Sequence, residues 1–390
     1  MRKQAKGKEN KENKKKRTQG NPKWAKVNEL RSGDFLLMIF TAALVIFGII
    51  MVFSASYYYS ISQDGTAYSY LRRQIMWVVF GAAFDYRRYR KFAIPFLILG
   101  VILLALIFTP LGHTANNATR WLKVGPITFM PGEFAKLFVI IFTAWFLSEK
   151  PDRIKSVTRG ILPLVGIAAV YGLLIVKQPN LSTAITVCGI IVSMMLVAGM
   201  KWRYVFGTAA LGGAGILSIL LFMKDTYWYQ RMTSFVDPFQ DPLGEGYQAV
   251  QSLLALGSGG LFGVGLGKSV QKNLYLPEPQ NDFILAIIGE ELGFIGIVLV
   301  LALYCCFLWR GVHVAINAPD QFGMLLASGI VLMVGIQVIL NIAVVTSSMP
   351  PTGINLPFIS YGGNALLMFM FSAGVLLNIS RHAPKNTGVE

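Results

Sequence analysis

The chain alternates long runs of apolar residues with short segments that carry charge, proline or glycine. A helix needs about 20 apolar residues to cross the hydrocarbon core of a bilayer, and most of these runs reach that length with modest tilt or extension. The pattern therefore predicts an all-α polytopic membrane protein with about ten transmembrane helices. The predicted spans are 35–54, 74–84, 92–109, 134–147, 160–176, 182–199, 204–222, 283–308, 322–346 and 355–379.

The second run is short, because its apolar part, residues 75–84, has only ten residues between Arg73 and Asp85. Either it is a truncated or re-entrant segment, or residues have been lost there. Counting it as a crossing, with a cytoplasmic N-terminus, puts Lys or Arg in every inner loop, as the positive-inside rule requires. Both termini are then cytoplasmic. The inner cations are Arg87, Arg88, Arg90, Lys91, Lys150, Arg153, Lys155, Arg159, Lys201, Arg203, Arg310, Arg381 and Lys385.

Composition supports the membrane class. Hydrophobic residues make up 54% and charged residues 14% of the chain, against roughly 25% charged residues in an average soluble domain. This charge is too sparse to coat a globular surface, which excludes a soluble enzyme and a disordered tail protein. The three cysteines lie inside apolar runs without metal-ligand spacing, so neither a disulfide framework nor a metal site is predicted.

The net charge of +16 is concentrated at one end of the chain. Residues 1–33 hold twelve Lys or Arg against three Glu, a block that is typical of a disordered juxtamembrane tail with affinity for anionic lipid. Nucleic acid is not an expected partner. The predicted organisation is a cytoplasmic tail (1–33), a ten-helix membrane domain (34–380) and a short cytoplasmic tail (381–390).

One long segment, residues 223–282 between spans seven and eight, falls on the extracytoplasmic side in this topology. It is too aromatic for disorder, so we expect the functional surface there. Residues 246–263 predict an amphipathic or re-entrant helix followed by a glycine turn. The glycines of 257–269 do not form a P-loop, because that motif needs glycine at Phe262, and close backbone packing around a turn is favoured.

Acidic residues lie at the end of this segment and again inside the span that follows it. Asp282 precedes the eighth span, where it could cap the helix, as could Asn281, or act as a carboxylate at the membrane boundary. Glu290 and Glu291 would sit about 12–13 Å deeper at 1.5 Å per residue. Charges at that depth indicate either a polar cavity or a buried structural network.

A second group of charges precedes the fourth span. Glu133 and Lys136 share one helix face and either form a local ion pair or, with Arg120 and Lys272, line a cationic site for an anionic headgroup. Arg120 and the adjacent Trp121 also suit an interfacial anchor.

The sequence resembles the SEDS family (shape, elongation, division and sporulation), the bacterial peptidoglycan glycosyltransferases related to FtsW, RodA and SpoVE. The resemblance covers about residues 34–380. It is carried by Asn117-Ala118-Thr119-Arg120-Trp121, Pro131-Gly132-Glu133-Phe134-Ala135-Lys136-Leu137, Gln178-Pro179-Asn180-Leu181-Ser182-Thr183-Ala184, Gly246-Tyr247-Gln248-Ala249-Val250-Gln251-Ser252, the glycines of 257–263, Leu276-Pro277-Glu278, Asn281-Asp282-Phe283 and Gly353-Ile354-Asn355-Leu356-Pro357-Phe358-Ile359-Ser360-Tyr361-Gly362-Gly363.

The resemblance implies a ten-helix polymerase that joins lipid II units into glycan strands, with a class B penicillin-binding protein and other division or elongation proteins as partners. Asp282 matches the essential carboxylate, and Glu133 and Lys136 match residues of the central cavity. Through their motifs, Gln251 and Ser360 join the substrate-binding residues. The chain departs from the family in its short second span, in QNDF, and in Asn180 and Ser182, where the family has QPDxGTA.

The expected reaction forms a β-1,4 link with inversion. Asp282 would deprotonate or orient the acceptor 4-hydroxyl, while Arg120, Lys136 and Lys272 would stabilise the diphosphate, directly or around a divalent cation (Mg²⁺ or Mn²⁺). Two alternatives stay open: a lipid II flippase that uses Glu290, Glu291 and a polar cavity as a translocation path, and a non-enzymatic division scaffold. The basic tail and GINLPFISYGG favour division or sporulation over elongation.

Overall fold

A computed structural model describes residues 33–64, 85–115, 118–125, 127–207, 210, 213, 235, 237–244 and 246–383. The predicted span 74–84, most of 204–236 and almost all of the two tails lie outside the described residues. Long helices dominate the described part of the chain. Seven of these helices are long and apolar enough to cross a bilayer, in agreement with a polytopic membrane protein. The helices are α2 (Phe35–Asp64), η2 (Tyr86–Phe92), α4 (Ala93–Leu106), α5 (Pro131–Glu149), η3 (Pro151–Lys155), η4 (Val157–Ile161), α6 (Leu162–Val176), α7 (Leu181–Val197), α10 (Tyr247–Gly259), α11 (Ile284–Ile316), α12 (Gln321–Val345) and α13 (Gly363–Arg381).

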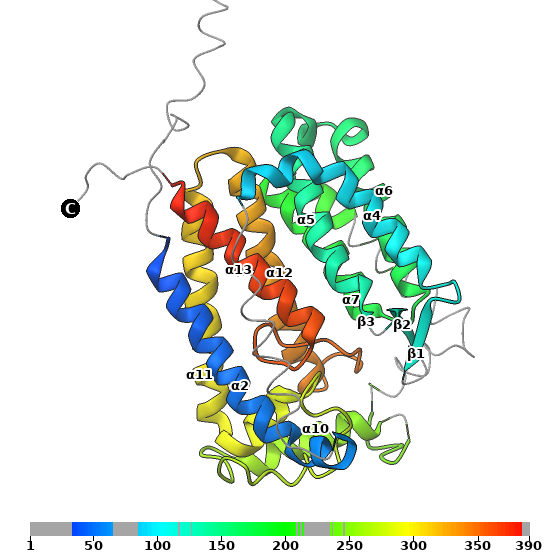
Figure 1. The fold of residues 1–390 in the computed structure, drawn as a ribbon, viewed down its shortest axis with the longest axis vertical. Helices are drawn as coiled ribbons and strands as arrows, with labels where there is room; N and C mark the ends of the chain where they lie inside the picture. The colour runs from blue at the N-terminus through cyan, green and yellow to red at the C-terminus, as the bar shows by residue number, and fades with distance from the viewer. Residues whose placement is uncertain are drawn as a thin grey trace, which may run out of the picture.

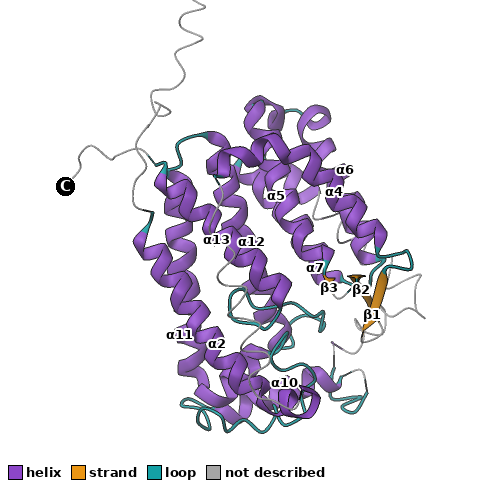
Figure 2. Ribbon diagram, viewed as in Figure 1, coloured by secondary structure: helices purple, strands orange, loops and turns teal. Residues whose placement is uncertain are grey.

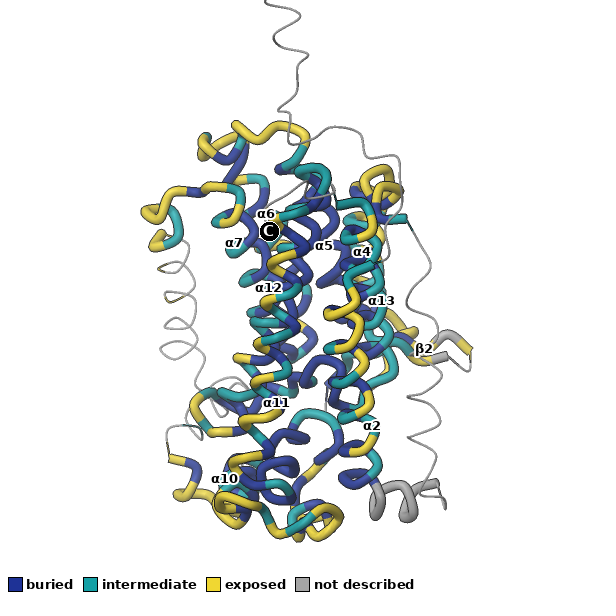
Figure 3. Tube along the Cα trace, turned by 90° about the vertical axis from the view of Figure 1, so that its left-hand side faces the viewer, coloured by how far each residue is buried: buried dark blue, intermediate teal, exposed yellow. Residues whose placement is uncertain are grey.

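Helix α5 occupies the centre of the bundle. Fourteen of its nineteen residues are buried, which is expected of a helix that is apolar on all sides and surrounded by protein. It packs against α4, α7 and α12, and α12 in turn packs against α11. The buried part of the trace follows α5 and α12 in Figure 3, whereas α4 shows alternating exposed positions. The exposed residues of α4 are apolar, as a lipid-facing surface requires.

The two ends of the bundle carry different elements (Figures 1 and 2). One end carries α10, glycine-rich loops and a small antiparallel sheet in the order β1-β2-β3, formed by Gly112–Ala115, Ala118–Val124 and Ile127–Phe129. The hydrophobic pattern did not predict this sheet, because its strands are short and lie between two spans. The other end carries η2 and η3, which are rich in Lys and Arg.

Helix α11 is broken, so the prediction of one continuous helix over 283–308 is wrong at Gly293. This glycine has φ +68° and ψ −167°, and a Cβ placed on Gly289 would contact the Ile297 side chain at 3.0 Å. In a straight helix residues eight apart are separated by about 12 Å. The two arms, 284–292 and 294–316, therefore meet at a sharp bend, and the second arm is long enough to span a bilayer.

The glycine-rich loop repairs the break in α11. The amides of Val264 and Gly265 donate to the Glu290 and Glu291 carbonyls at 2.9 and 3.0 Å, and the amide of Phe294 donates to a carbonyl of the loop. Gly260, Gly263, Gly265 and Gly267 all have positive φ, and they follow helix α10 directly. The prediction of a helix followed by a tightly packed glycine turn is confirmed.

The last span also differs from its prediction. Helix α13 begins at Gly363, eight residues later than the predicted start at 355. Pro350, Pro351 and Pro357 disfavour helix, and Phe358 has φ +65°. Residues 350–362 instead form an irregular segment that enters the bundle, where a Cβ on Gly48 of α2 would lie 2.7 Å from Ile359.

Candidate functional site

A cavity of about 490 Å³ opens at the end of the bundle that carries the sheet. Its volume lies within the range of about 300–1,000 Å³ that is common for small-molecule sites. Both charged and apolar residues line it. The lining consists of Ala118, Arg120, Trp121, Met130, Glu133, Glu278, Asn281, Asp282, Gly353, Asn355, Tyr361, Gly362, Gly363, Asn364 and Ala365.

Four segments that are distant in sequence form the cavity, and three of them supply its charged groups. Asp282 lies just before the first arm of α11, Arg120 is on β2, and Glu133 is in the first turn of α5. The segment before α13 supplies the remaining wall. The structure thus brings together three of the seven residues that sequence patterns singled out.

The backbone that carries Asp282 is held at three consecutive carbonyl groups. Tyr361 N donates to Gln280 O at 2.9 Å, Ser360 Oγ to Asn281 O at 2.6 Å, and Asn341 Nδ2 to Asp282 O at 2.9 Å. Hydrogen bonds of this kind fix a functional side chain within a fraction of an ångström. Ser360, predicted to bind substrate, is buried, lies outside the cavity lining and donates to the backbone next to Asp282.

The expectation that Asn281 could cap the eighth span is wrong. The cap residue of α11 is Phe283, which makes no side-chain cap bond. Asn281 directs its amide to Glu278 Oε2 at 2.8 Å, and it lines the cavity together with Glu278. The segment before α11 is therefore ordered by its own turn and by its three hydrogen-bonded carbonyls.

Arg120 and Asp282 approach each other around Gly353. A Cβ on Gly353 would lie 2.9 Å from Asp282 Oδ2 and 3.5 Å from Arg120 Nη1. The Gly353 backbone has φ +68°, a conformation that L side chains rarely adopt. Arg120 also donates through Nη2 to the Pro179 carbonyl. Glycine at this position lets a carboxylate and a guanidinium face the same volume.

A buried ion pair lies next to this cavity. Lys136 Nζ is 2.7 Å from Glu133 Oε2, and both side chains are less than 10% exposed. Lys136 also donates to Gln337 Oε1 at 3.1 Å and lies over the Phe369 ring. The pair is the local one that its spacing predicted, with Glu133 at the cavity wall and Lys136 one turn farther in.

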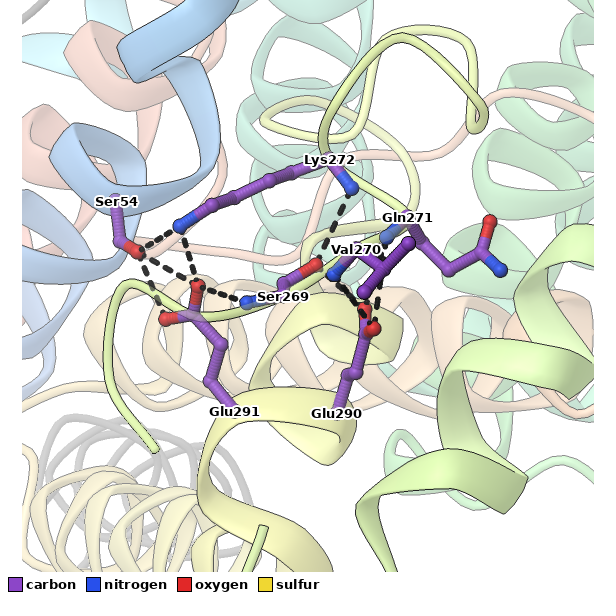
Figure 4. A network of polar contacts seen from close by, with 7 residues as sticks. All are labelled: Ser54, Ser269, Val270, Gln271, Lys272, Glu290 and Glu291. Carbon is purple, nitrogen blue, oxygen red and sulfur yellow. Dashed lines mark hydrogen bonds and ion pairs between the residues drawn. The ribbon is translucent and has the colours of Figure 1, made fainter. Parts of the chain in front are cut away.

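Lys272 does not reach the cavity. Its Nζ lies 2.8 Å from Glu291 Oε1 and 3.1 Å from Ser54 Oγ (Figure 4). The neighbouring Glu290 accepts from Ser269 Oγ at 2.5 Å and from the amide of Val270 at 2.8 Å. Of the two interpretations of the paired glutamates, the structure supports the buried network.

The network lies near the end of the bundle and not deeper than Asp282, so the predicted depth of Glu290 and Glu291 is also wrong. Ser54 is six residues beyond Gly48 on α2, a rise of about 9 Å. Gly48 marks the level of residues 358–360, which contact the Asp282 segment. The first arm of α11 therefore runs from Asp282 toward the end of the bundle, and its bend lies there.

The remaining predicted residue, Gln251, lies on α10 and is half buried outside the cavity lining. Two residues that depart from the family pattern have structural partners. Asn180 caps α7 by accepting from Thr183 N at 3.2 Å, and Ser182 Oγ donates to Thr352 O at 2.7 Å.

Sequence reasoning missed Gln337 and Asn341 of α12, which hold Lys136 and the Asp282 segment. Their signal was present, since two amide side chains four residues apart interrupt an otherwise apolar span and share one face. Metal binding has less support. Among the described residues no group of three or more His, Cys, Asp or Glu is arranged to hold a metal ion.

Comparison with known proteins places these features in a family. Residues 34–385 match the family described as "Cell cycle protein", that of FtsW, RodA and SpoVE. "Stage V sporulation protein E" of Bacillus subtilis is 42% identical over 90% of this chain and 98% of its own. "Probable peptidoglycan glycosyltransferase FtsW" of Geobacter metallireducens is 37% identical over 91% of this chain and 96% of its own.

Solved structures agree with the sequence relatives. A chain from a structure titled "Structural coordination of polymerization and crosslinking by a peptidoglycan synthase complex" superposes with a TM-score of 0.74 at 26% identity, over 90% of this chain and 98% of that chain. The rod shape determining protein RodA of Thermus thermophilus superposes with a TM-score of 0.65 at 26% identity, over 91% and 99% of the two chains.

Proposed function

The chain belongs to the FtsW, RodA and SpoVE family and is a peptidoglycan glycosyltransferase of the membrane. We propose that it polymerises lipid II at the cavity around Asp282. The convergence of Asp282 and Arg120 on Gly353 carries this proposal. A base and a permanent cation side by side match the two charge changes of the reaction, at the acceptor hydroxyl and at the leaving diphosphate.

In the proposed reaction, the acceptor 4-hydroxyl oxygen attacks the anomeric carbon of the donor sugar. The new carbon–oxygen bond forms as the bond to the diphosphate breaks, and the bonding electrons leave with the diphosphate. The hydroxyl proton passes to the Asp282 carboxylate. Attack opposite the leaving group inverts the anomeric centre and gives a β-1,4 link.

Arg120 stabilises the charge that grows on the diphosphate. Its guanidinium stays protonated at physiological pH and presents donors in a fork that fits phosphate oxygens. Lys136 contributes from behind Glu133, at longer range. Lys272 is not part of this proposal, because Glu291 already neutralises it in a separate buried network.

A divalent cation fits the site only in a limited way. Mg²⁺ is often held by one or two carboxylates together with substrate phosphates, and Asp282, Glu133 and Glu278 supply carboxylates at the cavity wall. Mg²⁺ or Mn²⁺ bound there would add positive charge at the diphosphate.

The cavity faces the extracytoplasmic side in this proposal. The opposite end of the bundle carries the Lys- and Arg-rich helices η2 and η3, and cytoplasmic loops are enriched in these residues. Both termini are then cytoplasmic. A class B penicillin-binding protein would crosslink the product, since the structural relative comes from a complex named for polymerization and crosslinking. Division or sporulation is the proposed setting, in line with the FtsW and SpoVE relatives.

A lipid II flippase is less well supported. That alternative relied on Glu290 and Glu291 as polar steps along a path through the membrane. Both carboxylates are at most 1% exposed and are occupied by serine, lysine and backbone donors, which leaves them no surface for a passing headgroup.

Polymerisation of purified lipid II by the full-length protein, with its class B partner present, tests the proposal. Asp282→Asn is compared with Asp152→Asn, which removes the same charge at an exposed pair outside the cavity. We expect glycan ladders from wild type and Asp152→Asn, and at least about a 100-fold loss for Asp282→Asn, because a general base supplies about 10²–10⁴-fold. Ladders of normal yield from a folded Asp282→Asn variant would refute the role of Asp282.

A further inference from the structure

Asn341 is a fully buried amide near the C-terminal end of an apolar helix. Its neighbours on α12 are mostly Val, Ile and Leu, yet its side chain has no exposed surface. Burying an amide is costly unless its polar atoms are paired. The Nδ2 group donates to two backbone carbonyls, Asp282 O at 2.9 Å and Ile354 O at 2.7 Å, whereas Oδ1 has no hydrogen-bond partner among the described residues.

The two acceptors belong to the two chain segments that meet where Gly353 faces Asp282. Ile354 follows Gly353, whose Cα faces the Asp282 carboxylate and Arg120. The Asn341 amide group therefore links the Asp282 segment to the Gly353 segment, in addition to the bonds from Ser360 and Tyr361. Neither segment is helical where they meet, so the separation between the carboxylate and the glycine backbone depends on these links, and the Asn341 bridge is the one next to Gly353.

Asn341 differs from the other two groups that hold the Asp282 segment. Ser360 and Tyr361 belong to the irregular segment 350–362 and would move with it. Asn341 belongs to a long helix that packs against α5, α7 and α11. One turn earlier on the same face, Gln337 binds Lys136. Helix α12 thus connects both charged parts of the site to the bundle.

We propose that Asn341 is a positioning residue for the glycosyl transfer, which acts by holding Asp282 and Gly353 at a fixed separation. The inference rests on the proposed role of Asp282. Asn341 itself does not line the cavity, so it contacts no substrate, and its effect passes through the two carbonyls. Loss of the bridge is expected to slow the chemical step while substrate binding is retained.

The test uses the full-length protein with lipid II and compares Asn341→Asp with Asn341→Gln. Aspartate keeps the size of the side chain but replaces the amino group with an oxygen that repels both carbonyls, whereas glutamine keeps the donor group. The control is Asn378→Ala, which removes a hydrogen bond between an asparagine side chain and the backbone (Tyr86 N to Asn378 Oδ1, 3.1 Å) near η2, away from the cavity.

Misplacing a reacting group by about 1 Å costs about 100-fold in rate. For Asn341→Asp we therefore expect kcat to fall about 10- to 100-fold while KM for lipid II stays within about twofold. Asn341→Gln should recover part of this loss, and Asn378→Ala should keep the wild-type kcat at a similar melting temperature.

Three results would overturn the inference: a wild-type kcat in Asn341→Asp, an equal loss in Asn341→Asp and Asn378→Ala that follows their melting temperatures, or a rise in KM with kcat unchanged. If any of these occurs while Asp282→Asn stays inactive, the role of Asp282 survives and only the role of Asn341 fails. An active Asp282→Asn variant would instead remove the premise of both.

Discussion

Replacing Gly353 with alanine tests whether the distance between Asp282 and the 353–361 segment controls the reaction. The substitution adds one methyl group 2.9 Å from Asp282 Oδ2 and 3.5 Å from Arg120 Nη1. It also places alanine at φ +68°. The left-handed conformation costs a non-glycine residue roughly 1–2 kcal/mol, so part of the effect is expected to be a loss of stability alone.

A matched control separates strain from displacement. Gly125, in the turn between β2 and β3, has φ +61°, and among the described residues, its chain neighbours aside, no atom lies within 4 Å of its Cβ position. Gly125→Ala therefore carries the same conformational cost without a contact. In Gly353→Ala the carboxylate must also retreat to about 3.4 Å, where ordinary contacts begin, a shift of about 0.5 Å. Catalytic groups must be held within about 0.5 Å of their productive geometry.

The assay measures kcat and KM for lipid II and the melting temperature of both variants. We expect equal melting temperatures, and a kcat about tenfold lower in Gly353→Ala than in Gly125→Ala, because a misplacement of about 1 Å costs about 100-fold. Equal kcat values in the two variants would refute the argument, since a displaced Asp282 would then have no consequence for the reaction.

Two further predictions concern stability. Lys272→Met leaves Glu291 without its cation in a buried network, which we expect to lower the free energy of unfolding by about 3–5 kcal/mol. Arg90→Met breaks an exposed pair with Glu149 and should lower it by less than about 1 kcal/mol. Equal melting temperatures of the two variants would contradict this contrast. Gly263→Ala places a Cβ against the Glu291 carbonyl at φ +80°, so a wild-type melting temperature would show that the loop does not pack tightly against the bend in α11.

The hydrophobic pattern predicted the spans well where one helix crosses the membrane without interruption. The predicted run 322–346 is helix α12 to within one residue at each end. The hydrophobic pattern failed where an apolar run contains a break. Hydrophobicity alone does not indicate the turn at Gly293 or the loss of helix at the prolines before α13. In both places the carbonyls and amides freed from the helix are bound by segments distant in sequence, which no local pattern can indicate.

The residues of the site could also be predicted only in part from the sequence. Asp282, Arg120 and Glu133 were selected from their charge, their position near the outer ends of predicted spans and the family motifs, and the structure places all three on one cavity. Lys272 was grouped with them as a further cation, yet its charge is neutralised elsewhere. The type and position of a charged residue indicate that it needs a partner, but not whether that partner is another residue or a substrate.

The break in α11 connects these observations. Asp282 lies just before the start of its first arm, and Glu290 and Glu291 lie at the end of that arm. The Asp282 end is fixed by Asn341, Ser360 and Tyr361, and the glutamate end by the network around Lys272. An arm of nine residues held at both ends cannot rotate without breaking buried polar contacts, each of which is costly to leave unpaired. The buried charges around Lys272 lie outside the cavity, yet they help to keep the arm that follows Asp282 in one position.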